Sequence, residues 1–218
     1  MTRPRVSETD QGIQGEFAVN KYDQMQRRLR DKGWIETEDI IRNGITKGLA
    51  LEIGSGPGYL GLEWLKNTER TNLKGLDISS DMISIAEHNA IDYGFSKRVE
   101  YVHGNGNKVP FNDEKFDAVF SNGSLHEWSE PQNTFNEMWR VLKKGGRFFI
   151  SDLRRDMFFL IKWFLWFNTK PKEIRPGFIT SINAAYTPEE LKDLIKGTNL
   201  ENSEVSGNPI HLKLTGVK

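Results

Sequence analysis

The 218-residue chain contains no cysteine. Disulfide frameworks, thiolate metal sites and cysteine nucleophiles are therefore excluded, and so are enzymes that attack a pyrimidine ring through a thiol. The chain also lacks an excess of charge, because 30 basic and 30 acidic side chains give a formal net charge of zero. A neutral total gives no support for general nucleic-acid binding. No metal-ligand spacing is visible, and we predict no metal.

Long hydrophobic runs are missing as well. The polar amino terminus has no apolar core of the kind that secretory signals carry, so we expect a cytoplasmic protein. The most apolar stretch, 157–167, has eleven residues and is interrupted by Lys162. A membrane-spanning helix needs about 20 such residues. We expect 157–167 to be a buried helix, a lid over the substrate, a dimer contact or a peripheral membrane contact.

Apolar runs and helical patterns alternate through the middle of the chain. Strands are expected at 49–53, 73–78, 99–103, 116–121 and 147–151. Helices are expected at 16–32, 36–43, 59–67, 79–94, from Pro131 to a stop at Gly145-Gly146, and from Thr187 to Gly197. Two final strands, near 202–206 and 210–217, could pair at an edge. Such alternation predicts an α/β fold, doubly wound, with a mostly parallel sheet covered on both faces.

A glycine-rich turn, Gly54 to Gly58, follows the first expected strand. Glycine lets a backbone turn tightly and approach a ligand closely. A dinucleotide fingerprint needs its third glycine at the sixth position. That position is Tyr59 here, which argues against a nicotinamide dehydrogenase. Glu52 precedes the turn, and its carboxylate would repel a pyrophosphate but suit a cationic ligand such as S-adenosylmethionine. A plain strand-to-helix connection is the alternative.

An acidic residue ends the second expected strand. Asp77 lies 23 residues after Gly54, close to the spacing at which an acid accepts hydrogen bonds from a ribose in nucleotide-binding sheets. Asp77 could also cap the helix that begins near Ser79. The two roles are compatible.

Five segments in order then resemble one family. They are 51–58, 76–82, 103–111, 116–122 and 140–146, with a weaker match at 185–191. The family is the class I S-adenosylmethionine-dependent methyltransferases, and the nearest branch resembles the ubiquinone and menaquinone biosynthesis methyltransferases. The resemblance covers about 48–151. It implies a Rossmann-like sheet of seven strands with an antiparallel edge hairpin, S-adenosylmethionine as cofactor and S-adenosylhomocysteine as product.

The resemblance also implies a set of cofactor-binding residues. Asn105 stands where the family usually has aspartate, and its amide oxygen can still accept a hydrogen bond. Glu52 and the turn would hold the methionine part, Asp77 the ribose, and Ile78 and Met82 would flank the adenine. The full set is Glu52, Gly54, Ser55, Gly56, Gly58, Asp77, Ile78, Met82, Asn105, Gly106, Ser121 and Asn122.

Methyl transfer asks mainly that the acceptor be held in line with the methyl group, and a base can assist by deprotonating the acceptor. His126, just after the fourth strand, is the candidate catalytic base; a packed histidine at the pocket rim is the alternative. Glu127 and Asp152 are weaker candidates. The other three histidines, His88, His103 and His211, are expected to be structural.

The acceptor is expected to be a small molecule, amphiphilic or quinone-like. The fourth segment lacks the Asn-Pro-Pro-aromatic run of enzymes that methylate base amines, so no DNA partner is expected. Residues 140–175 hold ten basic and three acidic side chains, which would suit an acidic amphiphile or an anionic surface. The alternatives are a non-catalytic protein that binds S-adenosylmethionine and a methyltransferase that acts on protein or RNA.

We expect a single domain with four parts. An N-terminal helical cap would cover 1–47, the cofactor-binding core 48–151, a lid or substrate segment 152–186, and a C-terminal helix with edge strands 187–218. Substrate choice is expected to depend on 1–35 and 152–186. The oligomeric state is left open.

Overall fold

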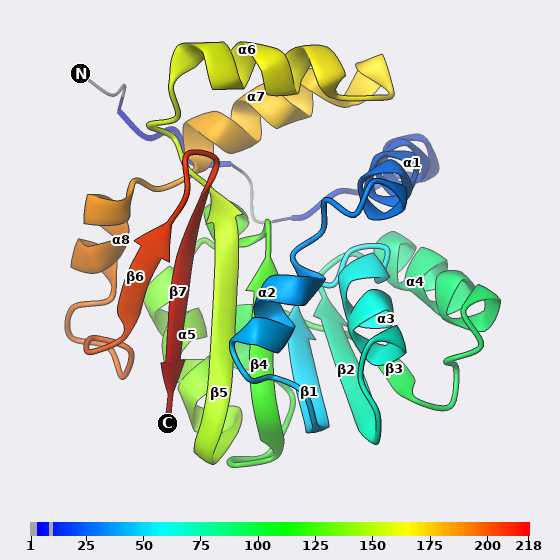
Figure 1. Ribbon diagram of the computed structural model, residues 1–218, viewed down its shortest axis with the longest axis vertical. Helices are drawn as coiled ribbons and strands as arrows, with labels where there is room; N and C mark the ends of the chain where they lie inside the picture. Colours follow the sequence, from blue (N-terminus) through cyan, green and yellow to red (C-terminus); the bar gives the residue numbers. More distant parts are fainter. Residues whose placement is uncertain (1–3, 9–10) are drawn as a thin grey trace.

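A seven-stranded sheet runs through the centre of the protein (Figure 1). The computed structural model describes residues 4–8 and 11–218. The strands lie in the order β3-β2-β1-β4-β5-β7-β6. Their bounds are β1 Gly48–Ile53, β2 Thr71–Asp77, β3 Val99–His103, β4 Phe116–Asn122, β5 Leu142–Leu153, β6 Glu204–Gly207 and β7 His211–Val217.

The first five strands pair in parallel, whereas β7 pairs antiparallel with both β5 and β6. The predicted doubly wound sheet with an antiparallel edge hairpin is therefore confirmed. The strand order reverses between β1 and β4, and ligands of such sheets bind beyond the carboxyl ends of the strands at this point.

Helices cover both faces of the sheet. They are α1 Glu16–Asp31, α2 Thr37–Arg42, α3 Tyr59–Lys66, α4 Ser80–Asp92, α5 Pro131–Val141, α6 Phe159–Asn168, α7 Arg175–Ala184 and α8 Pro188–Leu194. Short 3-10 helices join them, namely η1 Gly106–Lys108, η2 Leu125–Glu127 and η3 Lys172–Ile174.

The side chains of β4 show how the sheet is sealed. Val119 belongs to the core under α5 and α8, whereas its neighbours Ala118 and Phe120 belong to the core under α2 and α3. Neighbouring residues of a strand point to opposite faces. Because both faces are covered, these side chains are all buried.

The boundary between α5 and β5 differs from the prediction. The expected helix continued to Gly145-Gly146, but α5 ends at Val141 and Leu142 already pairs with Phe116 in extended conformation. The pairing then jumps to Ala118 with Arg147. The glycines thus lie within an irregular stretch of β5, and Gly145 takes a φ of +75° that suits it to such a bend.

The helices α6 and α7 form a hairpin at one end of the molecule (Figure 1). No residue of α6 is buried, so the interpretation of 157–167 as a buried core helix is wrong. Within the part of the chain that the structure describes, every helix is too short or too polar to cross a bilayer.

Candidate active site

The glycine-rich turn is pinned against the end of β2. The amide groups of Gly54 and Ser55 both donate to the Leu76 carbonyl, at 2.8 and 3.2 Å. Gly54 has a φ of +70°, and a Cβ there would lie 2.6 Å from the side chain of Ser124. Only glycine fits this position without strain. The close approach brings the turn after β1 and the loop after β4 to one place.

Asp77 lies beside this turn with its carboxylate held by two backbone amides. Oδ2 accepts from Gly56 N at 2.7 Å and Oδ1 accepts from Ser79 N at 2.9 Å. Burial raises the pKa of Asp77, and the hydrogen bonds from Ser79 and Gly56 oppose that rise. The cap of α4 itself is Ser79, whose hydroxyl accepts from Met82 N at 3.2 Å. Asp77 is thus anchored at the carboxyl end of β2 without being the helix cap.

A cavity opens at the carboxyl ends of β1, β2 and β4. The space inside the cavity, with its open mouth included, is about 780 Å³. Eight predicted cofactor residues line it, namely Gly54, Gly56, Asp77, Ile78, Met82, Asn105, Gly106 and Asn122.

Four predicted residues lie behind the cavity wall instead. Ser55 and Gly58 belong to the turn but do not line the cavity. Ser121 donates from its hydroxyl to the Ile53 carbonyl at 2.7 Å and so ties β4 to β1. The side chain of Glu52 faces α3, because a Cβ on Gly61 would lie 2.4 Å from Glu52 Oε2.

Glu52 is only 2% exposed, and no hydrogen-bond partner for its Oε2 is found among the described residues. Burial first, and the charge of Asp77 second, raise the pKa of Glu52 well above its usual value. The Glu52 side chain packs toward α3 and does not line the cavity. Its expected contact with the methionine part stays a prediction.

The N-terminal segment completes the cavity, and sequence reasoning missed its residues. Gly12, Ile13 and Tyr22 all line the cavity. The Ile13 carbonyl accepts from the Ser79 hydroxyl at 2.7 Å, which fastens the segment to the start of α4. The Tyr22 hydroxyl accepts from Gln26 at 2.9 Å. The sequence places Tyr22 in the expected helix 16–32, and only the tertiary structure shows what it covers.

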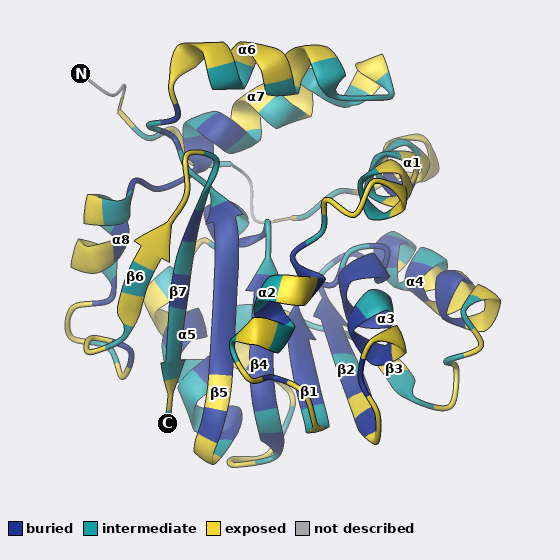
Figure 2. Cartoon of the chain, in the orientation of Figure 1, coloured by how far each residue is buried: buried dark blue, intermediate teal, exposed yellow. Residues whose placement is uncertain are grey.

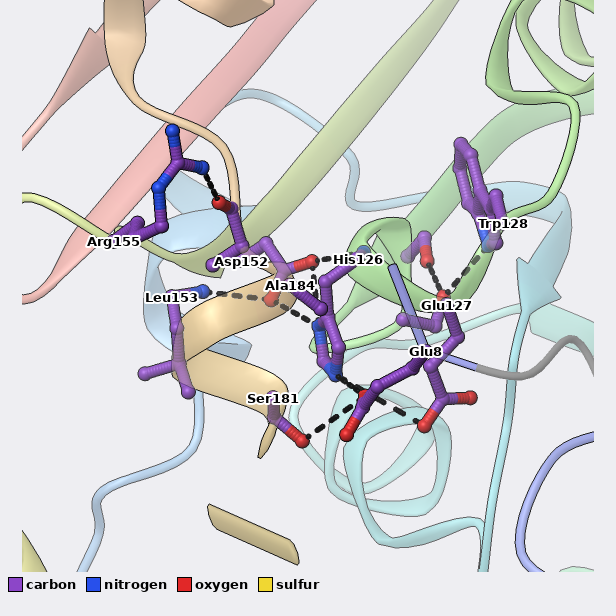
Figure 3. A network of polar contacts seen from close by, with 12 residues as sticks. Glu8, His126, Glu127, Trp128, Asp152, Leu153, Arg155, Ser181 and Ala184 are labelled. Carbon is purple, nitrogen blue, oxygen red and sulfur yellow. Dashed lines mark hydrogen bonds and ion pairs between the residues drawn. The ribbon is translucent and has the colours of Figure 1, made fainter. Parts of the chain in front are cut away.

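His126 lies in a network of carboxylates after β4 (Figure 3). Its Nδ1 is 2.9 Å from both Asp152 oxygens, and its Nε2 is 3.4 Å from Glu8 and 3.9 Å from Glu127. Burial would lower the pKa of His126, but Asp152 and then Glu127 and Glu8 raise it to about 9. The imidazole is thus protonated at neutral pH and does not line the cavity. Both facts argue against His126 as the catalytic base.

Glu8, His126 and Glu127 also place ligand-type atoms within 4.8 Å of one another. The distances from His126 to Asp152, Glu8 and Glu127 are those of an ion-pair network. Asp152 is fully occupied in this network, since it also accepts from the amides of His126 and Leu153, each at 2.7 Å. The prediction of no metal stays a prediction.

Glu127 is the member of the network that reaches the cavity. Burial raises its pKa to about 7; the His126 charge opposes the rise, and Glu8, Asp152 and Asp77 add to it. A carboxyl group with that pKa changes charge near neutral pH. Trp128, next in the chain, also lines the cavity and donates from its indole to the Ser124 hydroxyl at 3.2 Å.

The electrostatics of the cavity fit S-adenosylmethionine. Asp77 and Glu127 are its acidic residues, and no lysine or arginine occurs among the described residues that line it. A pyrophosphate would be repelled, whereas a sulfonium and an ammonium are attracted. The glycine turn supplies close backbone approach, and Ile78 and Met82 supply apolar surface.

Comparisons with known proteins indicate the family of the chain. Residues 51–150 match the family model described as a methyltransferase domain. The chain is 30% identical over 177 residues to a demethylmenaquinone methyltransferase of Bacillus subtilis strain 168, covering 78% of this chain and 74% of that protein. It is 28% identical over 176 residues to a ubiquinone/menaquinone biosynthesis C-methyltransferase of Psychromonas ingrahamii, covering 74% of this chain and 70% of that protein.

A solved structure shares the fold. It is described as a putative S-adenosylmethionine-dependent methyltransferase from Methanococcus maripaludis, with a TM-score of 0.73 at 24% identity, covering 100% of this chain and 97% of that chain. Together with the relatives above, the site and the sheet identify the protein as an enzyme that uses S-adenosylmethionine as its cofactor. The chain belongs to the class I S-adenosylmethionine-dependent methyltransferases.

Proposed function

We propose that this enzyme methylates a small aromatic acceptor of the hydroquinone type at the Glu127 end of the cavity. The observation that carries the proposal is the position of Glu127: it lines the cavity and has a pKa raised to about 7. An acceptor hydroxyl is a poor nucleophile until it loses its proton, and a base with a pKa near the working pH is best suited to take it.

We assign the cofactor to the opposite end of the cavity. Asp77 is placed to accept hydrogen bonds from the ribose, Gly54 and Gly56 to approach the methionine part, and Ile78 with Met82 to flank the adenine. Asn105, with Gly106 beside it, is assigned to the adenine amino group. When bound, S-adenosylmethionine supplies an electrophilic methyl group.

Glu127 and the residues around it have separate roles in activating and holding the acceptor. The Glu127 carboxylate takes the proton from the acceptor hydroxyl, which raises the electron density on the acceptor oxygen and on its ring. His126 is a positioning residue, because its charge limits how far burial raises the pKa of Glu127. Asp152 holds His126 in place. Tyr22 and Trp128 offer aromatic surface that suits a ring-shaped acceptor.

Two further observations support a small acceptor. The N-terminal segment lies over the cavity through Gly12, Ile13 and Tyr22, which leaves little room for a folded protein or RNA. Two of the relatives are named for methylation in quinone biosynthesis.

We also propose that the chain forms one domain with four parts. These are a helical cap at 1–47, a cofactor-binding core at 48–151, a substrate segment at 152–186, and a C-terminal helix with edge strands at 187–218.

The test is a direct assay of the purified protein with S-adenosylmethionine and a set of acceptors. The set contains demethylated naphthohydroquinones and benzohydroquinones with short side chains, a catechol, and a primary amine as a contrasting class. Product is identified by mass spectrometry together with S-adenosylhomocysteine. We expect methylated hydroquinone and little methylated amine. Turnover confined to the amine, or cofactor binding with no turnover on any acceptor, would contradict the proposal.

A further inference from the structure

The outer face of α6 is a concentration of exposed aromatic side chains. Phe159, Trp163 and Phe167 are 65%, 61% and 59% exposed and lie four residues apart. This spacing places them on one face of the helix. The segment 158–167 carries seven of the thirteen large apolar side chains that are exposed among the described residues. Figure 2 shows that α6 is exposed or half-buried along its whole length.

Such a surface needs a partner. Single exposed apolar residues are normal, but contiguous apolar patches mark binding surfaces for proteins or membranes. The rings are also ordered among themselves, since Trp163 and Phe167 stack with centroids 5.9 Å apart. In the structure this face points to solvent.

The charge around the patch indicates what the partner is. Residues 157–175 include four basic residues and one acidic residue, Glu173, which pairs with Lys21. Arg175 lies 4.4 Å above the ring of Trp166. Tryptophan flanked by basic side chains is typical of helices that lie in a membrane interface, where the rings enter the headgroup region and the cations meet anionic lipid. A second copy of the chain would instead bring the same positive charge against its own.

We propose that α6 docks the enzyme on the surface of an anionic lipid bilayer, with the ring face of Phe159, Trp163 and Phe167 inserted. The helix has ten residues, so it lies along the interface and does not span it. Lys170 and Lys172, just beyond its end, contact lipid phosphates.

The position of the α6–α7 hairpin indicates how a membrane-bound acceptor would reach the cavity. This step rests on the proposed function. α6 packs on α7, and α7 contacts η2, the short helix that carries His126 and Glu127. The α6–α7 hairpin lies beyond the carboxyl ends of the parallel strands (Figure 1), which is the end of the sheet where the cavity opens. A hydroquinone with an apolar tail would reach Glu127 from the membrane side.

Co-sedimentation of the full chain with unilamellar vesicles tests the docking. The vesicles contain phosphatidylcholine alone or phosphatidylcholine with phosphatidylglycerol. We expect binding to the anionic vesicles, weakened by salt and by Lys170→Gln/Lys172→Gln. We expect the double variant Trp163→Ser/Phe167→Ser to bind at least about tenfold more weakly.

The matched control is Trp34→Ser/Ile91→Ser. These two side chains are 51% and 64% exposed but lie outside the hairpin. The control should bind vesicles within about twofold of the native protein. Equal binding by the α6 variant and the native protein, or no binding by the native protein, overturns the proposal. So does a dimer in sedimentation velocity that Trp163→Ser/Phe167→Ser abolishes, if vesicle binding is absent.

Vesicle binding requires no turnover, so its outcome is separate from that of the acceptor assay. With a short-chain, water-soluble hydroquinone, Trp163→Ser/Phe167→Ser should keep native activity. With a long-chain hydroquinone in anionic vesicles, its rate should fall in parallel with its binding.

Discussion

His126 and Asp152 form a buried pair, with Nδ1 of the imidazole 2.9 Å from both carboxylate oxygens. The pair joins the loop after β4 to the end of β5, and its two members are 4% and 2% exposed. The imidazolium therefore faces Glu127 and Glu8 with its remaining N–H. One buried cation between three carboxylates sets the charge at the acceptor end of the cavity.

Removing the charge of Asp152 should destabilise the protein. In Asp152→Asn a buried imidazole loses its partner, and breaking such a pair costs about 3–5 kcal/mol of unfolding free energy. Urea unfolding measures the loss. The exposed pair of Asp193 with Lys196 supplies the control, because Asp193→Asn should cost no more than about 1 kcal/mol. Equal losses in both variants would contradict the assignment.

The same pair predicts a pH dependence of stability. The folded-state pKa of His126 is raised from 6.5 to about 9. A group with a raised pKa stabilises the fold fully below its unfolded pKa, and this contribution is lost as pH rises through the folded pKa. The native protein should therefore lose stability relative to Asp152→Asn between pH 6.5 and about 9. A constant difference between the two unfolding free energies across this window would argue against the raised pKa.

Glu127→Gln should abolish most of the turnover while leaving the cofactor bound. Loss of a general base lowers kcat by about 10²–10⁴. In the native enzyme, activity should rise with pH through about 7, as Glu127 ionises beside Glu8, His126, Asp152 and Asp77. Rate profiles with a hydroquinone acceptor measure both effects.

The control for Glu127→Gln is Glu87→Gln, which changes an exposed side chain of α4. It should keep the native pH profile. If Glu127→Gln kept that profile too, the base would have to be another group.

Alanine substitutions at Gly54 and Gly94 distinguish the effect of backbone strain from the effect of a side chain that intrudes on the turn. Gly54 and Gly94 have nearly equal φ values of +70° and +72°, but a Cβ would meet Ser124 only at Gly54. Both alanine variants should lose about 1–2 kcal/mol of stability from the left-handed backbone, and Gly54→Ala should lose about 1–3 kcal/mol more because its Cβ would meet Ser124. Only Gly54→Ala should also bind S-adenosylmethionine more weakly. Thermal unfolding and calorimetric titration test the two effects, and equal binding by both variants would contradict the role of the turn.

The elements that carry this account differ in how far the sequence could predict them. The sheet and the place of Asp77 follow from local patterns, since alternation of strands and helices and a glycine turn after β1 are encoded over short stretches. The predicted end of α5 is wrong because the helix is stopped by the pairing of Leu142 with Phe116, and this contact is long-range in sequence.

The directions of side chains, and the distant segments that pack over the cavity, are harder to predict from the sequence. Glu52 stands at the right position of its strand, but it lies on the face under α3. His126 was chosen for its type and place, and its partners Asp152 and Glu8 lie far from it in sequence. Tyr22 comes to the cavity through the packing of α1, which no local pattern specifies.

The most direct test of the central claim is calorimetric titration of the native protein, Asp77→Ala and Asp92→Asn with S-adenosylmethionine. Asp92 is exposed at the end of α4 and serves as the control. We expect saturable binding to the native protein and the control. We expect binding to Asp77→Ala to be weaker by roughly 10- to 100-fold, the worth of hydrogen bonds to a charged group. No binding to the native protein, or undiminished binding to Asp77→Ala, would contradict the assignment of the cofactor to this cavity.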